Sequence, residues 1–275
     1  MVPAVPAAKL EKGRILEADE IVVDLEDAVV PDAKDDARLA VLDALAQEWA
    51  TPAVAVRVNS IGTAWCHQDL AALASVGRPV TAVLPKVESS ADLAFADRLL
   101  AGAEAASGRA DAVRLLALIE TAAGLQAAGE IAGASARLDG LVLGYADLAA
   151  SLGRSVGGDW QFAREVVLTA ARTAGIAAID GPHLQIRDDD AFRAAVEHAS
   201  ALGFDGKWAL HPAQLDALRE AFTPTEEEIA AARATLDALE RAAAEGVGVV
   251  ADGDRMLDEA LAVSARRVLS RAGEA

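Results

Sequence analysis

The sequence lacks most of the features that mark secreted and membrane proteins. It contains a single cysteine, Cys66, so an internal disulfide is excluded and the thiol is expected to be a buried core residue. No uncharged apolar run is long enough to cross a bilayer, and residues 1–14 lack the apolar stretch of a signal sequence. These absences favour a cytoplasmic protein without a membrane partner.

Basic residues are also scarce relative to acidic ones. The chain has 25 Lys and Arg against 43 Asp and Glu, which gives a formal net charge of −18. A field of this sign repels phosphate backbones and anionic lipids, so nucleic acid and membrane are poor partners. An anionic small-molecule substrate would need a local basic pocket that stands against the global charge.

Aromatic residues make up only 4% of the chain, whereas hydrophobic residues as a whole reach 53%. The apolar side chains are mostly Ala, Val and Leu, which favours close packing of helices on a sheet. With 275 residues, the chain is long enough for one large barrel or for two small domains. Composition therefore indicates an α/β fold without choosing its architecture.

Short β-branched or apolar runs recur along the chain, and a helix-like stretch follows each of them. Their starts are separated by roughly 25 to 35 residues, the length of one strand–loop–helix–loop unit. Continuous apolar strands without in-and-out alternation indicate cover on both faces of the sheet. We predict eight strands, in the segments 2–5, 21–27, 53–59, 81–88, 115–121, 141–147, 176–182 and 207–212.

Amphipathic helices are expected between these strands, and the clearest cover residues 91–101, 160–173, 190–202 and 212–222. Eight such units close most naturally into a (β/α)8 TIM barrel over residues 1–222. A doubly wound open sheet is the alternative, since strand order cannot be derived from one sequence. The absence of a GxGxxG turn after the first strand weakens the dinucleotide-binding version of that alternative.

Residues 223–275 exceed what the barrel needs, and we predict a C-terminal helical extension of the same domain. The segment Thr-Pro-Thr-Glu from Thr223 resembles a helix start, with Thr223 as the cap and a Pro at the first helical position. This helix should reach about Glu245, and a glycine- and valine-rich link should lead to a final helix that ends near Gly273. The extension is equally compatible with an inert cap and with a lid that contacts a neighbouring subunit.

The working side chains of a (β/α)8 barrel come from the carboxyl ends of its strands. In this chain those ends carry mostly acids and a few bases. They are Asp24, Glu26, Asp27, Arg57, Asn59, Lys86, Glu88, Glu120, Thr121, Asp147, Asp180, His183 and His211. Carboxylates that converge on one mouth repel each other unless a cation is present. A donor set rich in carboxylates, without a Cys cluster or a close His pair, favours Mg²⁺ or Mn²⁺ over Zn²⁺.

Each of these residues also has a structural interpretation. Asp147 can cap the helix after its strand, and Glu120 can serve the helix that follows it. Arg57 and Lys86 can pair with the acids in a plain ion network, and His211 can be a hydrogen-bonded residue of the rim. The convergence of the acids, rather than any single residue, is what favours a metal site.

Six motifs occur in order along the chain. They are VVDLEDAV from Val22, RVN from Arg57, LPKVES from Leu84, LIET from Leu118, Gly-x-x-Asp-Leu from Gly144 and ALHPAQ from Ala209. Together they resemble the citrate lyase β-subunit-like branch of the HpcH/HpaI aldolase and citrate lyase family, over nearly the whole chain. The resemblance implies a Mg²⁺-dependent barrel lyase that cleaves or forms the bond between an acyl-CoA-type enolate and a 2-oxo acid.

The resemblance also implies roles for individual residues. Glu120 and Asp147 match the two metal carboxylates, and Arg57 matches the clamp for a substrate carboxylate. A metal ion held there would bind the hydroxyl and carboxylate of a citryl-, malyl- or citramalyl-CoA type substrate, so that Glu120 and Arg57 belong to both the catalytic and the substrate-binding sets. The implied product pair is an acyl-CoA and a 2-oxo acid such as oxaloacetate, glyoxylate or pyruvate.

Two further segments are similar to parts of the family. Lys9 and Lys12 lie in a basic stretch that matches the region meeting the CoA phosphates, and Lys12 is the better positional match. The segment DGDRMLDEA of the extension is similar to a lid that lends an acid to a neighbouring subunit, which points to Asp258 as the acid–base residue. Asp27 and Glu88 are local substitutes for that role. A homo-oligomer, trimer or hexamer, is therefore expected.

Two other functions remain open from the sequence. The same site could hydrolyse the CoA thioester, because hydrolysis and enolate formation begin from similar complexes. The chain could also be a non-catalytic subunit that binds oxaloacetate or an acyl carrier. We rank the lyase first, the thioesterase second and the binding subunit third.

Overall fold

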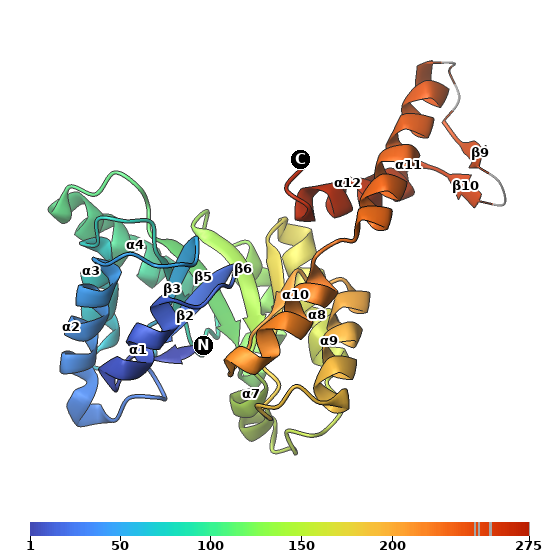
Figure 1. Cartoon of the computed structure of the whole chain (residues 1–275). Coiled ribbons are helices and arrows are strands. Elements are labelled where there is room, and N and C mark those ends of the chain that lie inside the picture. The colour runs from blue at the N-terminus through green and yellow to red at the C-terminus, as the bar shows by residue number, and fades with distance from the viewer. Residues whose placement is uncertain (245, 247, 253–254, 275) are drawn as a thin grey trace. The chain divides into compact units, whose positions relative to one another are not determined.

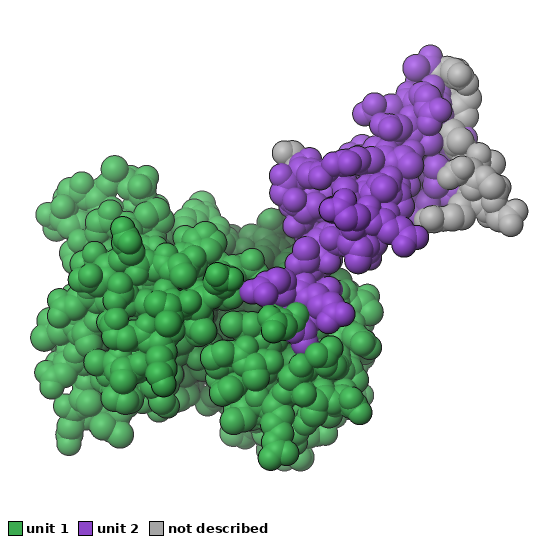
Figure 2. All heavy atoms as spheres, viewed as in Figure 1, with its two compact units in different colours: residues 1–216 green, residues 217–275 purple. Residues whose placement is uncertain are grey.

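The computed structural model describes residues 1–244, 246, 248–252 and 255–274. Contacts between residues divide the chain into unit 1, Met1–Asp216, and unit 2, Ala217–Ala275 (Figure 2). This division falls inside helix α10, Leu215–Phe222, whose last residue is the barrel boundary that the sequence predicts.

Unit 1 is an α/β fold built on eight parallel strands that curl around a common interior (Figure 1). The strands follow chain order across the sheet, so each one pairs with the strands before and after it in the sequence. This order excludes the doubly wound alternative, in which strand order reverses at a switch point. The strands are β1 Val2–Pro3, β2 Glu20–Asp24, β3 Ala53–Arg57, β4 Thr81–Leu84, β5 Arg114–Ile119, β6 Leu138–Leu143, β7 Ala177–Asp180 and β8 Gly206–Lys207.

Helices follow the strands as the βα repeat requires, and most of them lie along the two flanks of the sheet in Figure 1. A 3₁₀ turn, Pro31–Ala33, precedes α2, and another, Pro212–Gln214, precedes α10. The helices are α1 Ala7–Arg14, α2 Lys34–Leu45, α3 Cys66–Ala74, α4 Ser90–Ser107, α5 Ala122–Gln126, α6 Ala128–Ala132, α7 Tyr145–Leu152, α8 Gln161–Ala174 and α9 Asp190–Leu202. The predicted helices 91–101 and 190–202 lie within α4 and α9, and 160–173 matches α8 to within one residue at each end. The predicted helix 212–222 is a 3₁₀ turn followed by α10.

Local sequence explains where these helices begin and end. Ser89 and Asp92 form a reciprocal capping box at the start of α4, and Gly108 ends that helix in the left-handed conformation with φ 72°. The carboxylate of Asp189 caps α9 by accepting a hydrogen bond from the Phe192 N–H at 3.0 Å. Polar caps and left-handed glycines, Gly108 and Gly203, therefore mark the two ends of α4 and of α9.

The interior of the curled sheet is filled by side chains from across its width. The cluster consists of Val22, Ala55, Val83, Leu116, Leu118, Val142 and Trp208, with Met1 and Ile179 packed against it. Alternate residues of the same strands are equally buried on the opposite face, as Ile21 and Val23 show on either side of Val22. Burial on both faces confirms the expectation drawn from the continuous apolar strands. Cys66 is buried as well, as predicted.

Unit 2 contains helices α11, Glu226–Ala244, and α12, Glu259–Arg271, which pack against each other. Two strands lie between these helices in the sequence, β9, Val250–Asp252, and β10, Arg255–Leu257, and they pair with each other antiparallel. The sequence predicted only a link at this position. The predicted end of the first helix, Glu245, and three other positions of the link, 247, 253 and 254, lie outside the described residues.

The predicted cap of α11, Thr223, is wrong by two residues. Thr225 Oγ1 accepts a hydrogen bond from the Glu228 N–H at 3.2 Å, and Glu228 Oε2 accepts one from the Thr225 N–H at 2.8 Å. Thr223 cannot start this helix because its own N–H still bonds to Arg219 O, at 3.0 Å, at the end of α10. Both threonines have a glutamate three residues later, so spacing alone could not distinguish them.

Among the described residues, no helix has both the length and the apolar character that spanning a bilayer requires.

Candidate active site

The turn after β2 is held by its own side chains. Asp24, which is 1% exposed, accepts hydrogen bonds from the N–H of Glu26 at 2.9 Å and of Ala28 at 3.2 Å. The ammonium of Lys34 donates to the carbonyls of Leu25, at 2.8 Å, and Glu26, at 2.6 Å. These bonds fix the backbone of the turn, so the carboxylate of Glu26 has a defined position at the carboxyl edge of the sheet.

Arg57 ends β3 beside this turn, in register with Asp24. Its Nε and Nη2 donate to the two carboxylate oxygens of Asp24 at 2.8 and 2.7 Å, a bidentate pair. Burial opposes ionisation of both groups, but these hydrogen bonds raise the pKa of Arg57 and lower the pKa of Asp24. Only Nη1 is directed elsewhere, 3.0 Å from Glu26 Oε2 and 3.6 Å from Asp27 Oδ2.

This arrangement bears on the predicted substrate clamp. The bidentate face of Arg57 is already occupied by Asp24, so a substrate carboxylate has only the Nη1 side available. Glu26 Oε2 shares that side in an ion pair although its geometry is not that of a hydrogen bond. Asp27 is exposed and can move aside, whereas Glu26 is buried. The sequence contained a signal for the Asp24 pairing, because both residues end neighbouring parallel strands.

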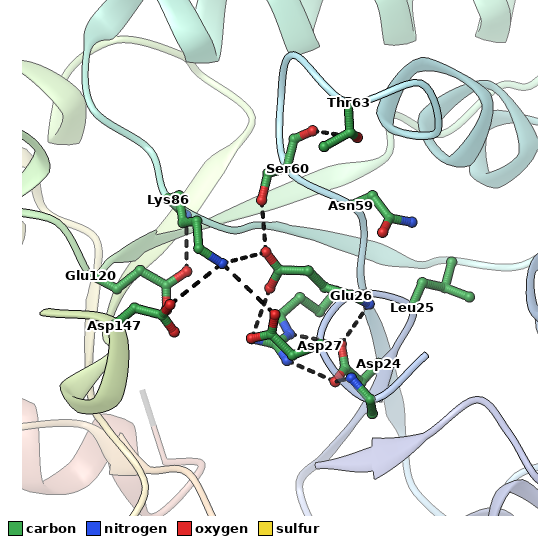
Figure 3. A network of polar contacts seen from close by, with 12 residues as sticks. Asp24, Leu25, Glu26, Asp27, Asn59, Ser60, Thr63, Lys86, Glu120 and Asp147 are labelled. Carbon is green, nitrogen blue, oxygen red and sulfur yellow. Dashed lines mark hydrogen bonds and ion pairs between the residues drawn. The ribbon is translucent and has the colours of Figure 1, made fainter. Parts of the chain in front are cut away.

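Lys86 follows β4 and connects the two sides of the site (Figure 3). Its N–H donates to Glu120 Oε1 at 3.0 Å, and its ammonium lies 2.6 Å from Glu26 Oε1. The same ammonium lies 3.7 Å from Asp147 Oδ1 and 4.0 Å from Asp27 Oδ1. We call Glu26, Asp27, Lys86, Glu120 and Asp147 the Lys86 cluster.

Glu120 follows the last residue of β5 and is 2% exposed. Burial and the neighbouring charge of Asp147 raise the pKa of its carboxyl to about 8. The adjacent helix α5 is capped by Thr121, whose Oγ1 accepts from the Gly124 N–H at 3.0 Å. Glu120 is therefore not needed as a helix cap.

Asp147 lies in the first turn of α7 and is partly exposed, facing Lys86. The N-cap of this helix is Gly144, so the capping interpretation of Asp147 does not hold. Gly144 also allows Glu120 to approach, since a Cβ at this position would lie 2.5 Å from Glu120 Oε2. The glycine that precedes Tyr145 thus has a role in the site that the sequence motif alone did not reveal.

The donor set of the Lys86 cluster fits Mg²⁺. Glu120 is a buried carboxylate whose charge is opposed by a second one, Asp147, and a divalent cation between them would remove that opposition. Among the described residues, no group of three or more His, Cys, Asp or Glu side chains forms a complete metal cage. Two carboxylates with the remaining positions left to water and substrate are typical of protein Mg²⁺ sites. Asp147 and Glu120 are the residues that would hold the ion.

A second group of buried charges lies at the ends of β7 and β8. Of its members, only Asp180 was among the residues predicted from the sequence. Lys207 Nζ donates to Asp180 Oδ2 and to the carbonyl of Gly181, both at 2.6 Å. Tyr145 Oη donates to Asp180 Oδ1 and accepts from Arg164 Nε at 2.7 Å. We call Tyr145, Arg164, Asp180 and Lys207 the Asp180 cluster.

Several predicted site residues are not part of either cluster. Lys9 and Lys12 are exposed side chains of α1, which packs against β1 and β2. Asp258, in unit 2, caps α12 by accepting a hydrogen bond from the Leu261 N–H at 3.1 Å. His211 accepts from the Ala213 N–H at 3.2 Å, the kind of hydrogen bond that its structural interpretation predicted, but its side chain is exposed rather than packed. The roles assigned to the two lysines and to Asp258 stay predictions.

Fold and site together define a class, the parallel α/β proteins with an acidic, metal-competent site at the carboxyl edge of the sheet. Residues 1–212 match the family model described as HpcH/HpaI aldolase/citrate lyase. The chain therefore belongs to the HpcH/HpaI aldolase/citrate lyase family, which confirms the resemblance found in its motifs.

The relatives of the chain extend over nearly its whole length. It is 37% identical to the L-malyl-CoA/beta-methylmalyl-CoA lyase of Rhodobacter capsulatus, over 93% of this chain and 88% of the relative. It is 38% identical to citrate lyase subunit beta of Escherichia coli K12, over 98% of this chain and 91% of the relative. The solved structure of CitE from Mycobacterium tuberculosis, in complex with magnesium, acetoacetate and coenzyme A, is 32% identical. It aligns with a TM-score of 0.75 over 99% of this chain and 96% of that chain.

Proposed function

We propose that this chain is a Mg²⁺-dependent carbon–carbon lyase that cleaves a β-hydroxyacyl-CoA to an acyl-CoA and a 2-oxo acid. Two relatives are named as lyases, of malyl-CoA and of citrate, and one solved relative holds magnesium together with coenzyme A. The observation that carries the proposal is the pair of Glu120 and Asp147. The charge of Asp147 acts on the buried carboxyl of Glu120, and both side chains lie beside Lys86 (Figure 3), at the edge of the sheet where barrel enzymes do their chemistry.

The residues of the chain divide the work of the reaction. Glu120 and Asp147 hold Mg²⁺, which when bound supplies Lewis-acid stabilisation of negative charge on the substrate oxygens. The Nη1 side of Arg57 orients the substrate carboxylate, and the Asp24 pair keeps the guanidinium charged and in place. A base removes the proton of the substrate hydroxyl as the C–C bond breaks, and the thioester enolate is then protonated to the acyl group. Asp258 is the first candidate for proton transfer, with Asp27 and Glu88 as substitutes.

The fold supports closure of the sheet into a complete (β/α)8 barrel. Trp208, beside β8, belongs to the packed interior cluster, and Met1, beside β1, packs against that cluster. A single filled interior with contributions from both ends of the sheet is what a closed barrel contains.

The remaining assignments concern substrate and assembly. Lys9 and Lys12 are exposed cations on α1 and are suited to the phosphates of CoA. Lys9 lies in the first turn of α1, nearer the carboxyl edge of the sheet than Lys12. A homo-oligomer, trimer or hexamer, would place Asp258 of one subunit in the site of another, and a cytoplasmic location agrees with a CoA-ester substrate.

The experiment that tests the proposal is a metal-dependent screen of malyl-CoA, citramalyl-CoA and citryl-CoA with the purified protein. A lyase releases a 2-oxo acid, which is detected as its hydrazone, and loses this activity when the metal is chelated. Glu120→Ala should abolish turnover while the protein keeps its circular dichroism spectrum. Release of free hydroxy acid without a 2-oxo acid would instead identify a thioesterase, and binding without turnover would identify a non-catalytic subunit.

A further inference from the structure

Lys86 has an unusual position for a cation in a metal site. Its ammonium lies 3.7 Å from Asp147 Oδ1, and its backbone N–H bonds to Glu120 Oε1. The residue therefore contacts both of the carboxylates that we assign to Mg²⁺. Among the described residues, it is also the one whose ammonium or guanidinium forms an ion pair with Asp147.

The backbone of Lys86 indicates that this position is held by specific contacts. Its φ is 51°, in the left-handed region that a residue with a long side chain rarely adopts. Such a conformation costs free energy and persists only when the surroundings fix it. The bond to Glu120 fixes the backbone, and the 2.6 Å bond to Glu26 Oε1 fixes the ammonium. Ser60 Oγ donates to the same Glu26 oxygen at 2.7 Å.

The charges explain what this arrangement does before a metal binds. The charge of Asp147 opposes the ionisation of Glu120, and the Lys86 ammonium partly offsets that opposition. A divalent cation between the two carboxylates would lie within a few ångströms of the ammonium, and like charges at that separation repel. A metal bound to Asp147 would therefore weaken the contact between Asp147 and the ammonium, and the ammonium would weaken the binding of the metal.

We propose that Lys86 is a tethered cation that competes with the divalent metal for Asp147 and thereby weakens metal binding by the free protein. Glu26 retains the ammonium when the metal displaces it, because the Glu26 contact is the shorter of the two. The side chain of Lys86 is 32% exposed, so solvent lies beside it and it has room to turn away from Asp147. The inference rests on the proposed function only in its assignment of the metal to Glu120 and Asp147.

The competing explanation is that Lys86 only stabilises the site. In that case its removal would leave two unbalanced acids, loosen the cluster and weaken metal binding or leave it unchanged. The two explanations therefore differ in one measurable quantity, the dissociation constant of the metal in the absence of substrate. Removal of the Lys86 charge should lower this constant if Lys86 competes with the metal, and should raise it or leave it unchanged if Lys86 only stabilises the site.

The test measures Mn²⁺ binding to the substrate-free protein by electron paramagnetic resonance. Lys86→Gln should tighten Mn²⁺ binding by about three- to tenfold, since the pair is partly exposed and its attraction is screened. Lys86→Asn should do the same and is better suited to a positive φ. Lys86→Arg keeps the charge and should bind Mn²⁺ like the wild type. Arg114→Gln removes an equal charge from the exposed pair with Asp139, at the amino end of β5, and should leave Mn²⁺ affinity unchanged.

The outcome separates this inference from the proposed function. Unchanged or weaker Mn²⁺ binding in both neutral Lys86 variants overturns the inference. Asp147→Asn, measured in parallel, reports on the metal site itself, since unaltered Mn²⁺ binding in that variant would overturn the proposed function. Loss of binding in Asp147→Asn with no tightening in the Lys86 variants would overturn the inference and leave the lyase assignment standing.

Discussion

Two groups of charges lie at the carboxyl edge of the same sheet, and they differ in how their charges are matched. In the Asp180 cluster, the carboxylate of Asp180 is fully buried and the side chain of Lys207 is 1% exposed, and the two form a direct 2.6 Å pair. Tyr145 and Arg164 also contact Asp180, and the carbonyl of Gly181 accepts a second bond from Lys207. In the Lys86 cluster, Glu120 is equally buried, but the bond it accepts comes from a backbone N–H.

This difference in pairing distinguishes buried charges that support the fold from buried charges that are available for chemistry. A buried acid whose partner is supplied by the fold contributes to structure, and removal of that partner leaves a costly bare charge. Glu120, a buried acid close to a second acid, has a raised pKa even beside the Lys86 ammonium, and it would gain from a further cation. Both clusters include α7, through Tyr145 and Asp147, so the matched cluster also supports the helix that carries a proposed metal ligand.

The largest effect is expected from a substitution in the Asp180 cluster. Lys207→Met should lower the free energy of unfolding by about 3 kcal/mol, because the buried carboxyl of Asp180 loses its closest cation and keeps only Arg164, 3.5 Å away. Urea unfolding followed by circular dichroism measures this loss. Arg114→Gln, which breaks an exposed pair, should cost less than about 1 kcal/mol and serves as the control. A loss below that control value in Lys207→Met would show that the Asp180 cluster is not a structural pair.

The second prediction concerns Glu120 and the pH dependence of the free energy of unfolding. The folded protein holds the Glu120 pKa at about 8, above the ordinary value of 4.5, so the folded state retains a proton that the unfolded state releases. The free energy of unfolding of the metal-free protein should therefore fall as pH rises between those two values. Glu120→Gln cannot ionise and should flatten this part of the profile, as denaturant unfolding at several pH values would measure.

A second acid with a raised pKa, the partly buried Glu20, provides the control for that profile. Burial, with the charge of Asp139 nearby, raises the pKa of Glu20 to about 7, so Glu20 contributes its own slope that ends at lower pH. Glu20→Gln should remove the slope that comes from Glu20 and leave the slope that comes from Glu120. Addition of Mg²⁺ should reduce the Glu120 slope and not the Glu20 slope. A profile that is identical in wild type and Glu120→Gln would contradict the assigned pKa.

The smallest effect is expected from a substitution of Gly144, the glycine beside Glu120. In Gly144→Ala, the new Cβ would lie 2.5 Å from Glu120 Oε2 and 2.6 Å from Glu120 Cβ, so the Glu120 side chain must shift. We expect a loss of about 1 to 3 kcal/mol in unfolding free energy together with weaker Mn²⁺ binding. Gly129→Ala is the matched control, since a Cβ there meets open space within helix α6. Equal Mn²⁺ affinity in both variants would show that Gly144 does not position Glu120.

The strands and the acids at their ends were predictable because a single property marks each of them. A buried parallel strand is a continuous apolar run, and the first polar residue after it, such as Glu120, lies at the working edge. Strand order was not predictable, since the runs carry no mark of which neighbour they pair with. The cap of α11 was misplaced because two threonines share the same spacing to a glutamate.

The partners within the site were less predictable than its members. Arg57 was expected to face a substrate, but its register opposite Asp24 commits one face of the guanidinium to the protein. Lys207 and Tyr145 meet Asp180 from different elements, and no local spacing joins the three. Gly144 matters through the space it leaves beside Glu120, and an empty volume has no signature in the sequence.

The sequential order of the strands has a consequence for synthesis of the protein. Since each strand pairs with the one made just before it, the growing chain can add strands one at a time as it leaves the ribosome. The Lys86 cluster is encoded entirely by residues up to Asp147, so every one of its residues has been synthesised before residues 148–275 are translated.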